Sequence, residues 1–307
     1  MNATAPAYAD YLTDADWRLL ARAVGLSAGA VTRLADDPAA IEALLADSRV
    51  FEAVFGVTDP AEMVLASPFL AFGVAVHRAV ADLAAMDYLP ERSGLRQRIP
   101  VFDAPELRDF LGSAQRRLFL AELLASFTRV ASGRYRVPSR WGGRPAPGGG
   151  GSGGRSRTRR FSELDPVRLA GLLEVAPEDS RPGIYRRLGD VSLFLAGVFP
   201  DYSVMHALGP VDASRLLRSA RVPVSERDGL AAAPALDLLE YLGARWYRAA
   251  LATAPVRTAR LDVVGEVAGR FRQARRVLNH LADRYLVSSS GPAGSPGGSW
   301  LPGPGTS

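Results

Sequence analysis

Eight arginines and no acidic residue lie between residues 132 and 160, and a glycine- and serine-rich run at residues 147–154 divides them. Guanidinium groups neutralise phosphates, and the nearby rings of Tyr135, Trp141 and Phe161 can stack on bases. This stretch therefore suits a flexible contact with nucleic acid. A solvated, disordered linker would have the same composition, so both interpretations stay open. The candidate nucleic-acid-binding residues of this stretch are Arg134, Arg136, Arg140, Arg157, Arg159 and Arg160.

A second pattern with chemical meaning covers residues 20–34. Ala21 is small where two helices would cross, Gly25 permits a left-handed turn, and Val31 would face back onto the first helix. With this spacing the segment resembles the helix-turn-helix of DNA-binding domains. A plain αα-hairpin needs the same small, glycine and apolar positions, and it is the alternative interpretation. The residues that the second helix would offer to a major groove are Ser27, Thr32 and Arg33.

His77 and Glu122 are the candidates for proton transfer, because each lies within an apolar helical segment. His77 has no carboxylate or second histidine three or four residues away, which favours a core histidine over a catalytic base or ligand. Glu122 belongs to a seven-residue spacing of polar residues along a helix expected from residue 103 to residue 130, which favours a solvated face. An enzyme of unrecognised type is the alternative, and it requires that these side chains line a pocket.

The chain has no cysteine, which excludes disulfides and thiolate metal sites. It also lacks the glycine-rich phosphate loops and the His-Glu-x-x-His pattern that mark common enzyme classes. We therefore predict no catalytic residues, no cofactor and no metal site. The net charge is +5, which is smaller than the contribution of the eight arginines at residues 132–160, so the positive charge is concentrated in that stretch.

The elements that must position these residues are mostly helices. The chain of 307 residues is 48% hydrophobic, which is ample for a large core. Apolar residues recur at spacings of three and four, which predicts an all-α protein with a multi-helix, bundle-like architecture. The main predicted helices are residues 14–24, 67–87, 103–130, 181–199, 234–252 and 264–285, with 181–199 at the centre. Alternating residues at 134–137 and 157–161 predict at most one β-hairpin, with a disordered Arg/Gly-rich tip.

The charge and glycine pattern also suggests how the chain is divided. We expect a helical lobe at residues 1–131, a flexible insertion or linker at 132–160, a second helical lobe at 161–287 and a disordered tail at 288–307. If the hairpin forms, the two lobes can belong to one continuous domain. No apolar stretch reaches the ~20 residues that a spanning helix needs, and the N-terminus has no apolar signal region. A cytoplasmic protein without membrane contact is expected.

Three classes of function remain. The leading hypothesis is a non-catalytic interaction or regulatory protein that binds a protein partner, or a second copy of itself, through helical surfaces. The first alternative is a nucleic-acid-binding protein that uses residues 20–34 together with the arginines of residues 132–160. The second alternative is an enzyme centred on His77 or Glu122.

Overall fold

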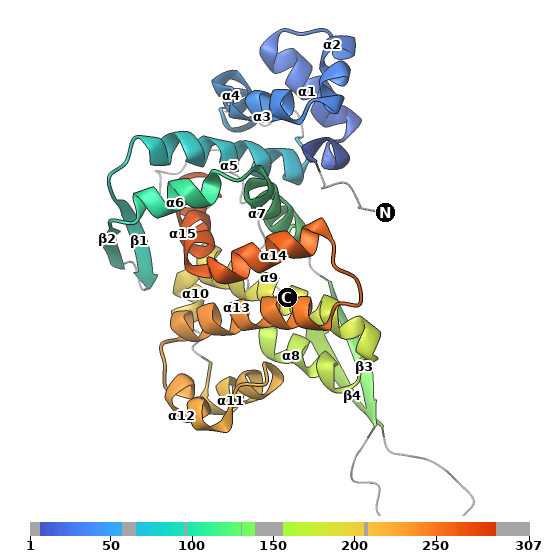
Figure 1. The fold of residues 1–307 in the computed structure, drawn as a ribbon, viewed down its shortest axis with the longest axis vertical. Coiled ribbons are helices and arrows are strands. Elements are labelled where there is room, and N and C mark those ends of the chain that lie inside the picture. Colours follow the sequence, from blue (N-terminus) through green and yellow to red (C-terminus); the bar gives the residue numbers. More distant parts are fainter. Residues whose placement is uncertain are drawn as a thin grey trace, which may run out of the picture.

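The computed structural model describes residues 7–56, 66–94, 97–129, 131–138, 156–205 and 208–286. Over these residues the chain is mainly helical, with two small antiparallel hairpins, which confirms the predicted all-α class (Figure 1). The expected disordered tip and tail fall on residues 139–155 and 287–307, outside the described residues. No helix in the described part of the chain has the length and apolar character needed to cross a membrane.

The first part of the fold is a cluster of short helices packed over one long helix, α5 (Figure 1). Its elements are η1 (Tyr8–Tyr11), α1 (Asp14–Val24), α2 (Ala28–Thr32), η2 (Arg33–Asp36), α3 (Pro38–Ala46), α4 (Ser48–Phe55) and α5 (Pro68–Ala84). Asp16 joins two of the helix starts. One of its carboxylate oxygens accepts the Thr13 N–H and the other accepts the Ser67 N–H, both at 2.8 Å, and the side chain is fully buried. The capping signals at these two positions therefore act together to seat α1 on α5.

The middle of the chain carries both hairpins. Its elements are β1 (Leu89–Gly94), β2 (Gln97–Val101), α6 (Ala104–Leu111), α7 (Ala114–Ser126), β3 (Ser132–Pro138) and β4 (Ser156–Ser162). Strands β3 and β4 pair in antiparallel register from Ser132 opposite Ser162 to Pro138 opposite Ser156, which confirms the predicted hairpin. The β1–β2 hairpin was not predicted. Pro90 lies opposite Pro100 in it, and prolines hide a strand because they cannot donate to the ladder.

The C-terminal part builds the centre of the molecule around α9, which is buried on nearly every side from Leu188 to Val198. This agrees with the prediction of a central helix at residues 181–199. The remaining elements are α8 (Pro166–Ala170), η3 (Gly171–Glu174), η4 (Glu178–Ser180), α9 (Arg181–Val198), α10 (Pro200–Met205), α11 (Pro210–Ser219), α12 (Val224–Ala231), α13 (Ala235–Thr253), α14 (Ala259–Gly269), α15 (Phe271–Leu281) and the π-helical turn η5 (Ala282–Leu286).

Two predicted long helices are each broken into two. The expected helix at 103–130 is α6 followed by α7, because Gly112 ends the first and Ser113 caps the second by accepting the Arg116 N–H. The expected helix at 264–285 is broken at Arg270, between α14 and α15. In both cases the apolar spacing of three and four continues across the break, so periodicity alone did not reveal it. The division into two lobes stays a prediction, and helices of both halves contribute to one apolar core.

Candidate functional site

The described residues enclose an open cleft of about 910 Å³, which we call the arginine cleft. It lies between α8 with η3, the start of α9, and α11 with the turn that follows it. Five of its lining residues are arginines and one is an acid. The residues that line it are Val167, Arg168, Ala170, Gly171, Leu173, Glu174, Arg181, Tyr185, Arg215, Arg218, Ser219 and Arg221.

Three of the five guanidinium groups each pair with an acid three residues earlier on their own segment. These contacts are Arg168 with Asp165 at 3.0 Å, Arg181 with Glu178 at 3.3 Å and Arg215 with Asp212 at 3.1 Å. Such exposed pairs contribute only about 0–1 kcal/mol each, so an anionic ligand can replace the acid at little cost. No carboxylate of a described residue lies within 4.0 Å of Arg218 or Arg221.

The backbone at Arg221 is unusual. Its φ is 53°, and among the described residues it is the one non-glycine residue with a positive φ. It follows α11 in the position that glycine normally occupies after a helix, where the Val222 N–H bonds back to the Leu217 carbonyl at 3.0 Å. Arg245 from α13 holds this turn through the carbonyls of Ala220 and Arg221, both at 2.6 Å. An arginine here costs about 1–2 kcal/mol relative to glycine, which suggests that its side chain is used.

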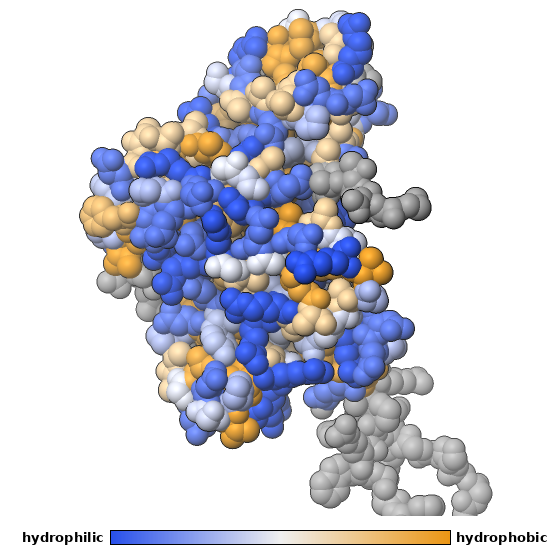
Figure 2. Space-filling model, viewed as in Figure 1, coloured by the Kyte–Doolittle hydropathy of each residue, from blue (hydrophilic) through white to orange (hydrophobic). Residues whose placement is uncertain are grey.

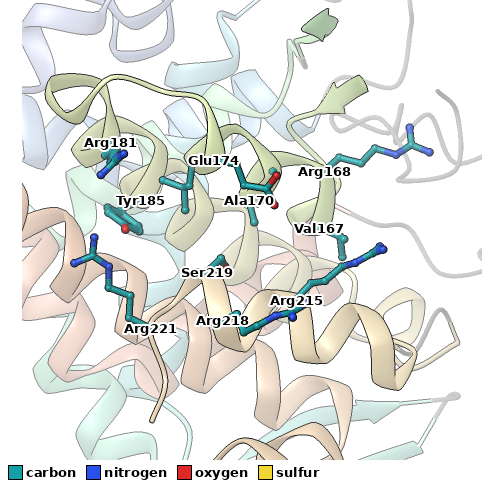
Figure 3. Close-up of a pocket in the computed structure, with 12 residues that line it drawn as sticks. Val167, Arg168, Ala170, Glu174, Arg181, Tyr185, Arg215, Arg218, Ser219 and Arg221 are labelled. Carbon is teal, nitrogen blue, oxygen red and sulfur yellow. The ribbon is translucent and has the colours of Figure 1, made fainter. Parts of the chain in front are cut away.

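Figure 3 shows how these side chains lie. Arg181 begins α9 and Arg221 lies in the turn after α11, and both side chains lie beside the ring of Tyr185. Arg168 and Arg215 extend in a common direction at the other end of the cleft (Figure 3). The guanidinium groups are therefore spread along the cleft and do not converge on one point. This spacing suits a ligand with several separated negative charges better than a single small anion.

The hairpin that carries five of the six arginines predicted from residues 132–160 lies next to this cleft. Strand β4 packs against α8, which carries Arg168 (Figure 1). The register places Arg134 opposite Arg160 and Tyr135 opposite Arg159, and Arg134 is exposed. Arg136 and Arg157 belong to the same two strands, whereas Arg140 lies outside the described residues. The structure thus brings five of the six predicted arginines to one hairpin beside an arginine-lined surface that the sequence did not reveal.

The helix-turn-helix-like segment lies at the opposite end of the molecule from the arginine cleft (Figure 1). Gly25 adopts the expected left-handed turn with φ 71°, and Val31 is fully buried. The second helix, α2, has only five residues. The Ser27 hydroxyl caps it by accepting the Ala30 N–H at 3.3 Å. Thr32 is its last residue and Arg33, which is exposed, begins η2.

Glu122 does not lie on the solvated face that its spacing predicted. Its side chain is 13% exposed and lines a second cavity of about 330 Å³, the Glu122 cavity. The prediction was wrong because the seven-residue spacing runs across the break between α6 and α7. Tyr11 of η1 donates its hydroxyl to the carboxylate, Arg260 of α14 contacts it at 2.9 Å, and Arg186 of α9 lies 3.9 Å away.

His77 does not line the Glu122 cavity. It is buried in α5, where its Nε2 lies 3.2 Å from the Tyr8 hydroxyl. Burial, together with the smaller effect of the nearby Arg117 guanidinium, lowers the pKa of His77 to about 3. A neutral core histidine, hydrogen-bonded to a tyrosine, is thus the state that the structure favours. Among the described residues no group of three or more histidine and acidic side chains could hold a metal ion.

Burial raises the pKa of Glu122 to about 7; Arg186 opposes the rise and Asp190 adds to it. The folded protein therefore binds more protons at this site than the unfolded chain does between about pH 4.5 and pH 7, so the contribution of Glu122 to stability falls as pH rises through that window. The lowered pKa values of His77 and His280 make stability rise with pH, in the opposite direction. The contribution of Glu122 is therefore measured as the difference between the wild type and a variant that lacks its carboxyl group.

We expect Glu122→Gln to gain stability relative to the wild type as pH rises from about 5 to about 8. Glutamine keeps an oxygen that can accept from Tyr11 and Arg260 but cannot titrate. Melting temperatures of both proteins across this range measure the difference. Parallel curves for the two proteins would contradict an elevated pKa at Glu122.

The five arginines of the cleft were not among the residues singled out from the sequence. Arg215, Arg218 and Arg221 recur at intervals of three, which was a visible signal, but Arg168 and Arg181 reach the cleft only through tertiary packing. Comparison with known proteins adds no assignment, since no protein-family model, curated protein or solved structure matches this chain.

Proposed function

We propose that the protein is a non-catalytic interaction protein that binds a nucleic-acid strand along the arginine cleft and the β3–β4 hairpin. The observation that carries the proposal is the composition of the cleft lining, in which five of the twelve residues are arginines and one is an acid. Phosphates spaced along a strand match such a row of separated cations, and release of their counterions drives the binding. A strand also fits an open cleft that has no helix positioned to enter a major groove.

Three further features support this proposal. Arg218 and Arg221 have no acidic partner among the described residues, so a phosphate would compete with no internal acid there. The strained backbone of Arg221 holds a guanidinium at the cleft at a cost in stability. The adjacent hairpin carries more arginines along its two strands, with Arg134 opposite Arg160, and Arg134 is exposed.

The test is fluorescence anisotropy of the full chain with a labelled single strand of about 20 nucleotides, in salt from about 50 to 200 mM. Affinity is expected to fall steeply with salt, and Arg218→Gln is expected to reduce the salt slope by about 1. Arg98→Gln, an exposed arginine on β2 that belongs to neither candidate interface, is the control and is expected to have no effect. Undetectable binding at the lowest salt would overturn the proposal.

The same titration, repeated with a labelled DNA duplex, separates the two nucleic-acid hypotheses. Arg33→Gln alters the helix-turn-helix-like segment and leaves the cleft intact. Loss of duplex binding in that variant, with Arg218→Gln unaffected, would transfer the interface to residues 20–34. A protein partner or self-association through helical surfaces stays a prediction. The face shown in Figure 2 carries apolar side chains in small separate groups among polar ones.

Arg221→Gly provides a sharper prediction, because stability and binding are expected to change in opposite directions. Glycine adopts a positive φ without strain, so the free energy of unfolding should be unchanged or raised by up to about 1 kcal/mol. Loss of the guanidinium should weaken strand binding about tenfold. Arg221→Ala, which keeps the strain and loses the same charge, is the matched variant and should be the less stable of the two. Binding unchanged in both variants would show that Arg221 does not contact the strand.

A further inference from the structure

The Glu122 cavity is separate from the arginine cleft and has a different character. Its lining combines apolar, mostly aromatic side chains with charges of both signs. The apolar residues are Tyr11, Phe69, Phe119, Leu123 and Ala125. The charged residues are Glu122, Arg186, Arg187, Asp190 and Arg260, and Ser126 completes the lining. Small-molecule sites combine an apolar body with a few converging polar groups in this way, and about 330 Å³ is at the lower end of their range of sizes.

Arg186 lies between the two acids of the cavity without hydrogen-bonding to either. Its guanidinium is 3.9 Å from Glu122 Oε2 and 4.0 Å from Asp190 Oδ2. No described residue accepts a hydrogen bond from its side chain, which is 30% exposed. An arginine held by charge alone keeps its fork of N–H donors available, and a carboxylate is the group that this fork fits best.

The two carboxylates keep matching acceptors. Glu122 uses Oε1 for both Tyr11 and Arg260, and Asp190 uses Oδ1 to accept from the Tyr247 hydroxyl at 2.8 Å. Glu122 Oε2 and Asp190 Oδ2, the two oxygens nearest Arg186, accept no hydrogen bond from a described residue. Burial raises the pKa of both acids, and an added cation beside them would relieve this cost.

We propose that the Glu122 cavity binds a free α-amino acid with an apolar or aromatic side chain. The ligand carboxylate pairs with Arg186, its ammonium group donates to Glu122 Oε2 and Asp190 Oδ2, and its side chain packs on Phe69 and Phe119. A ligand with both charges leaves every charged group of the cavity with an opposite partner. An amine without a carboxylate would leave Arg186 without a hydrogen-bonding partner, and a carboxylate without an amine would face the two acids.

Isothermal titration of the full chain with L-phenylalanine and L-leucine tests the proposal. Two truncated probes, 2-phenylethylamine and 3-phenylpropionate, each remove one charge and keep the ring. Phenylalanine is expected to bind at least about tenfold more tightly than either probe, because each probe leaves one set of charged groups in the cavity without its hydrogen-bonding partner. Equal binding of the amine or of the carboxylate would overturn the zwitterion assignment, and no heat with any of the four would overturn the site.

Two variants keep the result tied to this cavity. Glu122→Gln and Arg186→Gln should each weaken phenylalanine binding at least about tenfold with an unchanged circular dichroism spectrum. Arg218→Gln in the arginine cleft is the control and should bind phenylalanine as the wild type does. Wild-type affinity in Glu122→Gln and Arg186→Gln would show that the amino acid binds elsewhere and would overturn the proposal, whatever the outcome for the nucleic-acid strand.

Discussion

Replacing Glu91 with alanine is expected to lower the free energy of unfolding by about 3–5 kcal/mol. Glu91 lies on β1 and is buried, and its two oxygens bind Arg275 at 2.5 Å and Arg276 at 2.8 Å. Arg275 is itself buried and has only Glu240 as its other acidic partner among the described residues, at 3.1 Å. Without Glu91 the buried guanidinium of Arg275 keeps only one of its two carboxylate partners among the described residues. The cost of this uncompensated buried charge is larger than the stability that the ion pair itself contributes.

Chemical denaturation of the wild type, Glu91→Ala and Glu91→Gln measures this effect. Glutamine keeps the volume and one acceptor, so it should recover part of the loss. Asp212→Ala is the matched surface control: it removes the acid of the exposed pair with Arg215 and should cost less than about 1 kcal/mol. If Glu91→Ala lowers the free energy of unfolding as little as Asp212→Ala does, water reaches Arg275 and replaces the carboxylate.

Gly189→Ala is expected to destabilise the protein by about 1–3 kcal/mol, although alanine is the better helix former. A Cβ atom at this position on α9 would lie 2.4 Å from two ring atoms of Tyr247. That ring is fully buried on α13, and its hydroxyl donates to Asp190. The ring must move, and both the packing of α9 on α13 and the hydrogen bond to Asp190 suffer as a result.

Gly183→Ala provides the control on the same helix. No atom lies within 4 Å of a Cβ placed there, and the residue is exposed, so alanine should be neutral or stabilising by up to about 1 kcal/mol. Thermal or urea unfolding of the two variants compares the same substitution with and without a steric clash. Similar stabilities for Gly183→Ala and Gly189→Ala would show that α9 and α13 separate easily.

Local sequence signals predicted the parts of the fold that local chemistry determines. The predicted helix at residues 14–24 and the turn at Gly25 agree with the structure, because the cap at Thr13 and the turn at Gly25 each act within one turn of their own residue. The central position of α9 followed from its nearly continuous apolar surface. The β3–β4 hairpin followed from the alternation of its two strands.

The remaining features depend on contacts between residues far apart in the chain. The β1–β2 hairpin was missed because Glu91 is held by Arg276, which is 185 residues away. Glu122 was assigned to solvent because its spacing was measured along a helix that Gly112 interrupts. The arginine cleft needs three separate segments to meet, and neither periodicity nor spacing contains that information.

The ion pairs of Glu91 also affect the order in which the chain can fold during its synthesis. At about 5–20 residues per second, a ribosome needs roughly 10–40 s to travel from Glu91 to the arginine that binds it. During this time β1 has been made but lacks the cations that compensate its buried acid. The N-terminal half therefore cannot reach its final packing while it emerges, and the fold is completed only after the last long helix has left the ribosome.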